Sequence, residues 1–316
     1  MKFHRMVVFQ DSSIPYFSIQ ARQIQRLCDH DPSSEILWVH DEPSFLAALP
    51  EAEVVLSWHF DAQWFSLAPR LTRLATPAAG HDYFPQTLPP GVLVHHGTFH
   101  GPIMAETLVG MMLAFNRGIL TAHQKQLSGD LWPRLALPDV RLLWGTHAVI
   151  IGFGHIGQCF GRLLKAFGVR VTGIKRTPAP LPQGFSPEDR ILTAGSLTEV
   201  LPTADHLILI LPNDTGTDRL LDRDLLARLP AHAVIYNLGR GNCIDEQSLA
   251  DALKARRIRG ACLDVFAEEP LTARSPLAEN LPGLFRMPHA SAFSMKYMDL
   301  FIDEVIAWID NPSGRQ

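Results

Sequence analysis

Three polar side chains near the C-terminal end of the chain each come shortly after an apolar run of strand type: Arg240, Glu269 and His289. Because the carboxyl ends of parallel strands meet at one edge of a sheet, we expect these side chains to lie together. An arginine binds a carboxylate through its forked donors, and an imidazole exchanges a proton near neutral pH. The set suits the reduction of a 2-keto acid, in which Arg240 binds the carboxylate and polarises the carbonyl, Glu269 holds the imidazole, and His289 donates the proton.

Each of these residues also has an ordinary interpretation. Arg240 suits a surface ion pair, Glu269 suits the start of a helix, and His289 suits a turn. The three side chains follow three successive predicted strands, downstream of a nucleotide-binding pattern, and this combination favours a catalytic site over unrelated surface positions.

A glycine-rich turn predicts where a reducing cofactor would bind. The apolar run 148–151 is typical of a buried parallel strand, and Gly152, Gly154 and Gly157 follow it as G-x-G-x-x-G, before the helical spacing of 158–167. Such a turn leaves room for a pyrophosphate and offers it the unpaired N–H groups of a helix N-terminus. The alternative is a glycine turn that binds nothing.

The end of the next predicted strand, 169–174, indicates which dinucleotide fits. Lys175, Arg176 and Thr177 stand where an acidic residue would bond the ribose of NAD. Two cations and a hydroxyl can receive a 2′-phosphate, so we expect NADP(H) to be preferred, with NAD possible. A solvated basic turn with no influence on the cofactor is the alternative.

The composition restricts the class of protein. The chain has 316 residues, 47% of them hydrophobic, and a net charge of −4 without a basic stripe, which predicts two domains and no nucleic-acid partner. An apolar run of membrane-spanning length and a leader segment are both lacking, so we expect no membrane partner and a cytoplasmic location. The cysteines show no C-x-x-C spacing and indicate neither a disulfide nor zinc: Cys28, Cys159, Cys243 and Cys262.

The first hundred residues alternate between strand and helix patterns, which predicts an open parallel sheet. The predicted strands are 6–9, 35–39, 54–58, 71–76 and 92–95, and the predicted helices are 19–27 and 43–49. The small-residue loop that contains Ala79 and Gly80 follows one strand, where its N–H groups could hold a carboxylate. A plain turn in which Asp82 caps the next segment explains it equally well.

Three histidines, His95, His96 and His100, raise the question of a metal site. Adjacent residues on a strand face opposite sides, and the nearest carboxylate in sequence is Glu106. We therefore predict no metal and interpret these histidines as hydrogen-bonded loop residues.

The second half of the chain continues the alternating pattern. A long helix is predicted over 102–127, and its broad apolar face suits either a core or a subunit contact: Met104, Leu108, Met111, Met112 and Phe115. A connector follows at 128–145 and a Pro-rich surface loop at 178–187. The further predicted helices are 196–201, with Ser196 and Glu199 as a capping box, 220–229 and 247–257, and the further strands are 206–211, 233–236, 261–265 and 284–287.

Five ordered motifs give the sequence a specific resemblance. They are G-F-G-H-I-G at 152–157, L-P-N-D-T-G-T at 211–217, N-L-G-R-G at 237–241, L-D-V-F-A-E-E-P-L at 263–271 and M-P-H at 287–289. With these motifs the chain resembles the D-isomer-specific 2-hydroxyacid dehydrogenase family, and within it the glyoxylate and hydroxypyruvate reductases that use NADP.

The resemblance implies an α/β fold with two open parallel-sheet domains. A Rossmann dinucleotide-binding domain over 99–288 would be inserted into a flavodoxin-like substrate domain over 1–98 and 289–316. Arg240, Glu269 and His289 fall on the family's catalytic residues, and Ala79 and Gly80 fall in its carboxylate-binding loop. We expect the cofactor to contact Gly152, Gly154, His155, Ile156, Gly157, Lys175, Arg176, Thr177, Leu211, Pro212, Thr217, Leu238, Gly239 and Asp264.

Family members are usually dimers joined through the nucleotide-binding domain, which would place the Met-rich helix in the interface. Two other functions remain open. One is an NAD-linked dehydrogenase of the D-lactate or phosphoglycerate type, and the other is a non-enzymatic nucleotide-sensing protein of the same fold. The histidine-rich turn is unusual for the family and leaves the identity of the 2-keto acid open.

Overall fold

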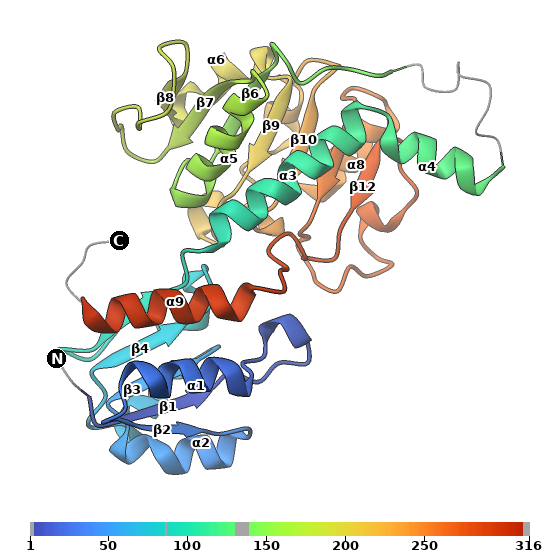
Figure 1. Cartoon of the computed structure of the whole chain (residues 1–316). Helices are drawn as coiled ribbons and strands as arrows, with labels where there is room; N and C mark the ends of the chain where they lie inside the picture. Colours follow the sequence, from blue (N-terminus) through green and yellow to red (C-terminus); the bar gives the residue numbers. More distant parts are fainter. Residues whose placement is uncertain (1–2, 86, 130–138, 312–316) are drawn as a thin grey trace. The chain divides into compact units, whose positions relative to one another are not determined.

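The computed structural model describes residues 3–85, 87–129 and 139–311 and consists of two compact units (Figure 1). The first unit comprises Met1–His100 with Phe293–Gln316, and the second comprises Gly101–Ala292. This division places His289 in the second unit, whereas the predicted C-terminal return begins at that residue. The functional domain bounds stay a prediction.

The first unit is built on five parallel strands in the order β2-β1-β3-β4-β5. Its strands are β1 (Arg5–Phe9), β2 (Glu35–Trp38), β3 (Val54–Ser57), β4 (Arg73–Thr76) and β5 (Leu93–His96). All five predicted strands of this region are present, and the central strands β3 and β4 are buried along their whole length. The strand order is that of flavodoxin-like sheets, which confirms the predicted fold class for this unit.

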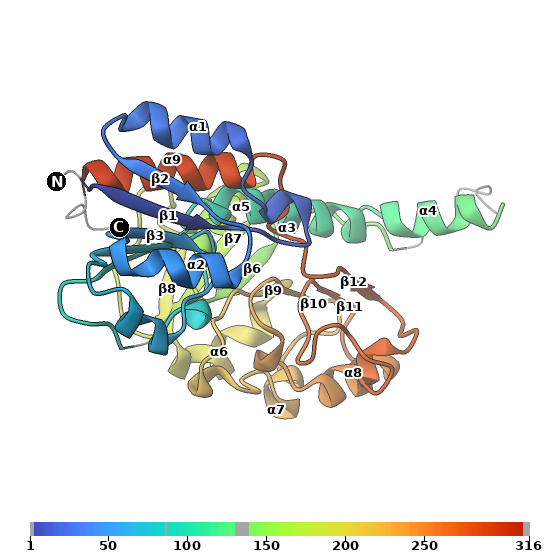
Figure 2. The same cartoon turned by 90° about the horizontal axis from the view of Figure 1, so that it is seen from below.

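The last helix of the chain belongs to the first unit. The helices of this unit are α1 (Ala21–His30), α2 (Glu42–Ala48) and α9 (Tyr297–Asp310), with 3-10 turns η1 (Pro15–Phe17), η2 (Leu49–Glu51), η3 (Ala62–Leu67) and η4 (His81–Tyr83). Helix α9 lies beside α1 in both Figure 1 and Figure 2. Arg22 forms an ion pair with Asp299 at 2.9 Å, and the Gln23 amide donates a hydrogen bond to the same carboxylate.

The second unit is built on seven parallel strands in the order β12-β11-β10-β9-β6-β7-β8. They are β6 (His147–Ile151), β7 (Arg170–Lys175), β8 (Arg190–Thr193), β9 (His206–Leu209), β10 (Val234–Asn237), β11 (Gly260–Leu263) and β12 (Leu284–Arg286). This is the Rossmann order, which confirms the predicted class. The sequence analysis missed β8, because this partly exposed edge strand offers only Ile191 and Leu192 as an apolar signal.

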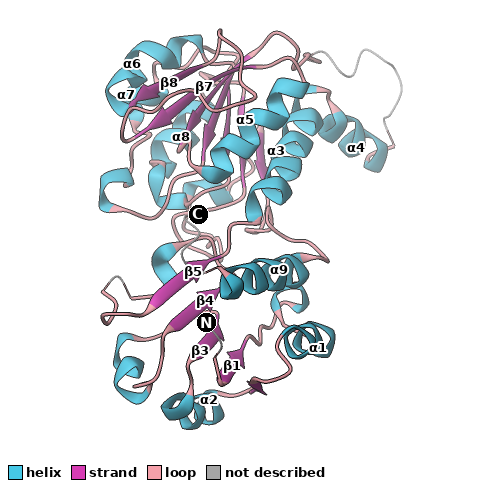
Figure 3. Ribbon diagram, turned by 60° about the vertical axis from the view of Figure 1, so that its left-hand side comes forward, coloured by secondary structure: helices cyan, strands magenta, loops and turns pink. Residues whose placement is uncertain are grey.

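Helices cover both faces of the second sheet, as Figure 3 shows. The helices of this unit are α3 (His100–Asn116), which begins in the first unit, α4 (Ile119–Leu127), which projects away from the sheet, α5 (His155–Ala166), α6 (Leu197–Val200), α7 (Arg223–Leu226) and α8 (Glu246–Lys254). The 3-10 turns are η6 (Ala194–Ser196), η7 (Leu201–Thr203), η8 (Thr215–Thr217), η9 (Gly241–Cys243) and η10 (Pro276–Ala278).

The single helix predicted over 102–127 is wrong. Gly118 adopts a φ of 69° in the left-handed region, which ends α3, and the chain resumes as α4 at an angle of 65°. Among the described residues, no single helix has both the length and the apolar composition needed to cross a bilayer, and α3 and α4 meet the criterion only as this bent pair. Part of the predicted connector, 130–138, lies outside the described residues.

The Met-rich face of α3 forms core in the second unit. Met104, Leu108, Met111 and Met112 are buried against the apolar residues of the sheet and of α5. Of the two roles that the sequence left open for this face, packing within the chain is the one that the structure shows.

Two short helices differ from their predictions. Ser196 has a φ of −90° and a ψ of 0°, and its side chain makes no cap hydrogen bond to α6, so the predicted capping box is wrong. Helix α7 spans four residues instead of the predicted 220–229, because Leu221 forms a β-bridge with Ile244 and Asp222 caps the helix through the Leu225 N–H at 2.9 Å.

Candidate active site

The glycine turn after β6 has the shape that a dinucleotide requires. Gly152 adopts a φ of 99°, and a Cβ there would overlap the Ile210 carbonyl at the end of β9. Gly154 lies at the N-cap of α5, is exposed, and has no atom within 4 Å of the place where its Cβ would be. This open cradle at a helix N-terminus lies at the point where the strand order reverses, between β6 and β9.

An aromatic side chain supports this turn from below. Phe153 is buried, and its ring occupies the space that a Cβ on Gly173 of β7 would fill. The N–H groups of Gly152 and Phe153 both donate to the Ile174 carbonyl, at 3.1 and 3.0 Å. The turn is therefore fixed to the interior of the neighbouring strand.

The other residues predicted to contact the cofactor follow β7, β9 and β10. His155 is exposed and Ile156 half-buried in the first turn of α5, and Gly157 is buried. Lys175 ends β7 half-buried, while Arg176 and Thr177 are exposed. After β9, Leu211 and Thr217 are half-buried and Pro212 is exposed, and after β10, Leu238 and Gly239 are buried. All of them stand at the carboxyl edge of the sheet.

Arg240 is presented by a loop that its neighbours hold tightly. The side chain of the buried Asn237, at the end of β10, accepts from the Gly239 N–H at 3.1 Å and donates to the Arg240 carbonyl at 3.0 Å. The Cys243 thiol donates to the same carbonyl at 2.9 Å, and burial raises the pKa of this thiol to about 12, so it keeps its proton. Arg240 itself is half-buried.

Glu269 and His289 are in direct contact. His289 Nδ1 lies 2.7 Å from Glu269 Oε2, while Oε1 of the same carboxylate accepts from the Phe266 N–H at 2.9 Å. The His289 side chain remains 47% exposed, so solvent reaches it. Its φ of 53° lies in the left-handed region, which is sparsely populated for residues other than glycine and is common at functional sites.

Asp264 holds the His289 loop in this conformation. Its carboxylate is fully buried and accepts from the Ala290 N–H at 2.7 Å and the Ser291 N–H at 2.9 Å. Its carbonyl accepts from the His289 N–H at 2.8 Å. In this structure Asp264 therefore positions the histidine, and its contact with the cofactor stays a prediction.

The loops that carry Arg240 and Glu269 touch through their main chains. They follow β10 and β11, which are adjacent in the sheet, and His289 follows the next strand, β12. A Cβ on Gly241 would overlap the Phe266 carbonyl carbon, so only glycine permits this approach. The three side chains that the sequence singled out thus belong to one continuous edge.

Sequence reasoning missed the residues that position this edge. Asn237 and Cys243 fix the Arg240 loop, and Glu246 at the start of α8 accepts from the Ala267 N–H at 2.9 Å and the Ser275 hydroxyl at 2.7 Å. Asn237 lies inside a quoted motif, but its role depends on contacts with residues that follow it in a folded loop. No sequence signal marks Glu246 apart from an acid in the first turn of a helix.

The Ala79–Gly80 loop lies in the first unit, after β4. The Thr76 hydroxyl accepts from the Ala78 N–H at 3.2 Å, and Ala79 and Gly80 are half-buried. The ring of His96 packs against His81 with centroids 4.2 Å apart, and burial together with His81 and His95 lowers the pKa of His96 to about 4. His96 is therefore neutral near pH 7.

The other two histidines have partners within the first unit. His95 is buried, and its Nε2 lies 3.3 Å from a Glu304 oxygen, while His100 Nε2 lies 2.9 Å from the Tyr297 hydroxyl. In the described ranges, no three His, Cys, Asp or Glu side chains are grouped as metal ligands would be. The four cysteines are free thiols.

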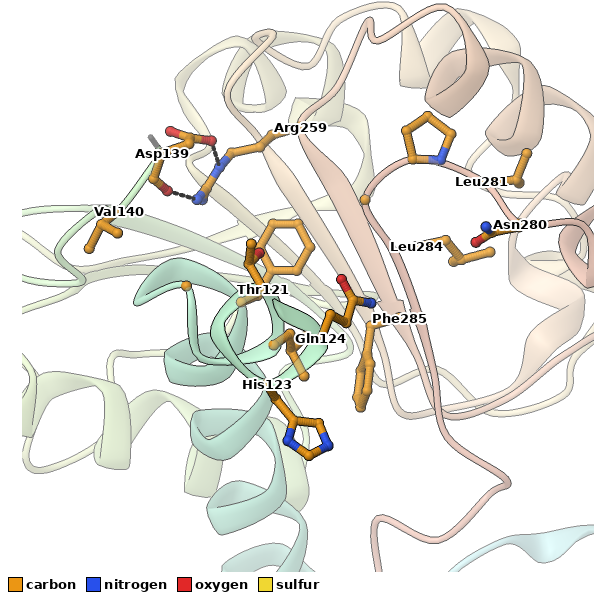
Figure 4. A pocket seen from close by; sticks show the side chains of 15 residues that line it. Thr121, His123, Gln124, Asp139, Val140, Arg259, Asn280, Leu281, Leu284 and Phe285 are labelled. Carbon is orange, nitrogen blue, oxygen red and sulfur yellow. Dashed lines mark hydrogen bonds and ion pairs between the residues drawn. The ribbon is translucent and has the colours of Figure 1, made fainter. Parts of the chain in front are cut away.

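A groove of about 660 Å³ lies at the opposite edge of the second sheet (Figure 4). It is lined by α4 residues such as Thr121 and Gln124 and by the start of β12. Arg259, just before β11, forms an ion pair there with Asp139. Because β11 and β12 begin at this edge and end beside Glu269 and His289, the groove is separate from the candidate active site.

Comparison with known families identifies the chain. Residues 109–291, more than half of it, match the family model described as D-isomer specific 2-hydroxyacid dehydrogenase, NAD binding domain. The chain belongs to the D-isomer specific 2-hydroxyacid dehydrogenase family. The five motifs follow β6, β9, β10, β11 and β12, which are neighbours in this order in the sheet.

Two curated members of this dehydrogenase family show how the similarity is distributed. The chain is 32% identical over 277 residues to D-3-phosphoglycerate dehydrogenase of Mycobacterium leprae, and the match covers 84% of this chain and 50% of that protein. The chain thus spans about half the length of this relative. It is 31% identical over 289 residues to glyoxylate/hydroxypyruvate reductase B of Yersinia pestis, where the match covers 88% of this chain and 86% of that protein.

Solved structures of dehydrogenases have the same fold. A D-isomer specific 2-hydroxyacid dehydrogenase family protein from Aeromonas salmonicida is 26% identical, with a TM-score of 0.81 over 100% of this chain and 97% of that chain. The NADPH-dependent glyoxylate/hydroxypyruvate reductase of Sinorhizobium meliloti, in complex with NADP and malonate, is 24% identical, with a TM-score of 0.72 over 98% of this chain and 95% of that chain. At that identity the second likeness shows the fold alone.

Replacing Asp264 by alanine is expected to destabilise the protein by about 2–4 kcal/mol, because two main-chain N–H groups lose their acceptor. Urea unfolding followed by circular dichroism measures this loss. The matched control is Asp218→Ala at an exposed acid, which should stay within about 0.5 kcal/mol of the parent. Equal stability of the two variants would contradict the anchoring role of Asp264.

Proposed function

We propose that this protein is a dehydrogenase that prefers NADPH and reduces a small 2-keto acid, such as glyoxylate or hydroxypyruvate, to the D-2-hydroxy acid where the product is chiral. The observation that carries the proposal is the pair of His289 and Glu269, 2.7 Å apart. This pair lies at the same sheet edge as Arg240 and the glycine turn. The reductase of Yersinia pestis, with 31% identity and extensive coverage, supports the substrate class.

The chain's own residues would divide the chemistry as follows. A bound nicotinamide supplies the hydride. Arg240 carries a permanent positive charge and forked donors, so it would bind the substrate carboxylate and stabilise negative charge that develops on the carbonyl oxygen. Glu269 engages Nδ1 of His289, which leaves Nε2 to deliver a proton to that oxygen. Ala79 and Gly80 remain the predicted carboxylate-binding loop of the first unit.

The preference for NADPH rests on Lys175, Arg176 and Thr177. No carboxylate follows β7 directly, and the exposed guanidinium of Arg176 suits a phosphate dianion. The name of the Sinorhizobium meliloti protein, an NADPH-dependent reductase in complex with NADP, agrees with this choice. NAD is the alternative cofactor for the same site.

The second candidate function is an NAD-linked dehydrogenase of the D-lactate or phosphoglycerate type. The 32% identity to the Mycobacterium leprae phosphoglycerate dehydrogenase favours the phosphoglycerate form. A nucleotide-sensing protein without turnover is less well supported, since His289 and Glu269 are paired as a proton donor requires. The cytoplasmic location stays a prediction.

We further propose that the protein is a homodimer joined through its second unit. The Met-rich face of α3 is already buried, so α4 is the better candidate for the contact. Ile119 and Leu127 on α4 are 54% and 74% exposed, and the groove beside this helix has room for side chains of a second copy.

Replacing His289 by alanine should reduce the turnover of glyoxylate with NADPH by about 10²–10⁴-fold, because the proton donor is lost. NADPH binding, followed by fluorescence, should stay within about twofold. The control is His232→Ala, which removes an exposed histidine elsewhere in the second unit. Substantial remaining turnover would exclude His289 as the proton donor. If the unmodified protein reduces no 2-keto acid, the enzymatic proposal fails and the binding protein is favoured.

The combined change Lys175→Asp and Arg176→Ala should weaken the binding of NADPH about 10- to 100-fold relative to that of NADH, since only NADPH carries the 2′-phosphate and an acid at this position can bond the ribose of NADH. Titrations with both cofactors measure the ratio of their dissociation constants. Arg228→Ala removes an exposed charge from α7's C-terminal side and serves as the control. An unchanged ratio would show that the phosphate binds elsewhere.

Sedimentation equilibrium should give about twice the chain mass of 35.1 kDa for the unmodified protein. Ile119→Asp combined with Leu127→Asp should shift it to the monomer, because buried carboxylates oppose association. Leu67→Asp, at an exposed apolar residue of the first unit, should leave the dimer intact. A monomeric parent protein would refute the proposed assembly.

A further inference from the structure

Arg176, which the proposed function assigns to the 2′-phosphate, has a carboxylate partner within the chain. Its Nη2 lies 3.3 Å from Asp214 Oδ2. The Arg176 side chain is 81% exposed and that of Asp214 41%, so solvent reaches both ends of the pair. An exposed pair of this kind is weak and can be exchanged for a better partner.

The topology gives this ion pair a definite place. Arg176 follows β7 and Asp214 follows β9, and these two strands flank β6 in the sheet. The pair therefore spans the end of β6, where the glycine turn begins. In a Rossmann sheet the ribose of the adenosine binds at the tip of the strand that corresponds to β7, so the Asp214 carboxylate stands beside the expected position of the 2′-phosphate.

The Asp214 side chain is held where it is. Its Oδ1 accepts from the Gly216 N–H at 2.8 Å, and its own N–H donates to the Thr217 hydroxyl at 3.3 Å. Asp214 is thus the N-cap of the turn η8. Its Oδ1 makes the cap hydrogen bond, and its Oδ2 faces Arg176. The cap hydrogen bond favours the orientation in which the carboxylate faces Arg176.

We propose that Asp214 determines cofactor specificity by reducing the advantage of NADPH over NADH. This proposal rests on the proposed function, since it assumes that Arg176 faces the 2′-phosphate. The carboxylate competes with the phosphate for the Arg176 guanidinium and repels a dianion nearby. NADH carries no such phosphate, so Asp214 leaves its affinity unchanged, and the protein uses both cofactors with a moderate preference for NADPH.

The test is Asp214→Asn, which keeps the capping oxygen and removes only the charge. Dissociation constants for NADPH and NADH are measured by fluorescence titration, so the readout does not depend on turnover. We expect NADPH to bind about three- to tenfold more tightly and NADH to stay within about twofold. The gain should shrink at about 0.5 M salt, because the interactions are exposed.

Two further variants make the result specific. Asp224→Asn removes an exposed acid in α7 and should leave the ratio of the two dissociation constants unchanged. In the Arg176→Ala background, Asp214→Asn should have a smaller effect on NADPH, because the competition for the guanidinium is gone.

A rise of about threefold or more in the preference for NADPH supports the proposal, and a smaller change or a fall overturns it. A fall would mean that Asp214 orients Arg176 for the phosphate. The proposed function is tested separately: if Lys175 and Arg176 prove to have no influence on the cofactor ratio, the phosphate site itself is misplaced, whatever Asp214→Asn does.

Discussion

The carboxyl edge of the second sheet depends on main-chain contacts that leave no space for a side chain. Gly152 lies against the end of β9, and Gly241 lies against the backbone of Phe266 after β11. These contacts bring the ends of β6, β9, β10 and β11 together at one surface. They also fix the positions of the glycine turn, Arg240 and Glu269 on that surface. A parallel sheet provides the common direction of the strands, but only this close approach makes neighbouring loops parts of one site.

Hydrogen bonds to Asp264 fix the segment that carries His289, which the close packing of the glycines does not reach. Asp264 is buried, and both of its carboxylate oxygens accept main-chain hydrogens of the segment that carries His289. A buried carboxylate is tolerated only where donors satisfy it, and here the donors come from the loop after the next strand. The left-handed conformation of His289 is the local cost of placing its ring against Glu269. Reactive geometry in this protein is thus maintained by groups that do not themselves react.

Most of the architecture could be predicted from the sequence, because buried parallel strands consist of short apolar runs. The predictions failed where the structure depends on the backbone conformation of a single residue or on contacts between segments distant in the sequence. Gly118 ends α3 through its own backbone conformation, although a helical pattern continues on both sides of it. Ser196 has the right spacing for a capping box but the wrong backbone angles. Asn237 and Asp264 gain their roles only after distant loops have met, so no pattern in the sequence marked them as anchors.

The ring of Phe153 beneath the glycine turn has a consequence for how this unit can change. The Phe153 ring fills the volume that a side chain at Gly173 would need, so the ring packs directly against the backbone of β7. A larger residue at position 173 requires a smaller one at position 153, whereas glycine at 173 is already the smallest residue possible. The shape of the pyrophosphate cradle thus depends partly on the absence of a side chain at one position of the neighbouring strand β7.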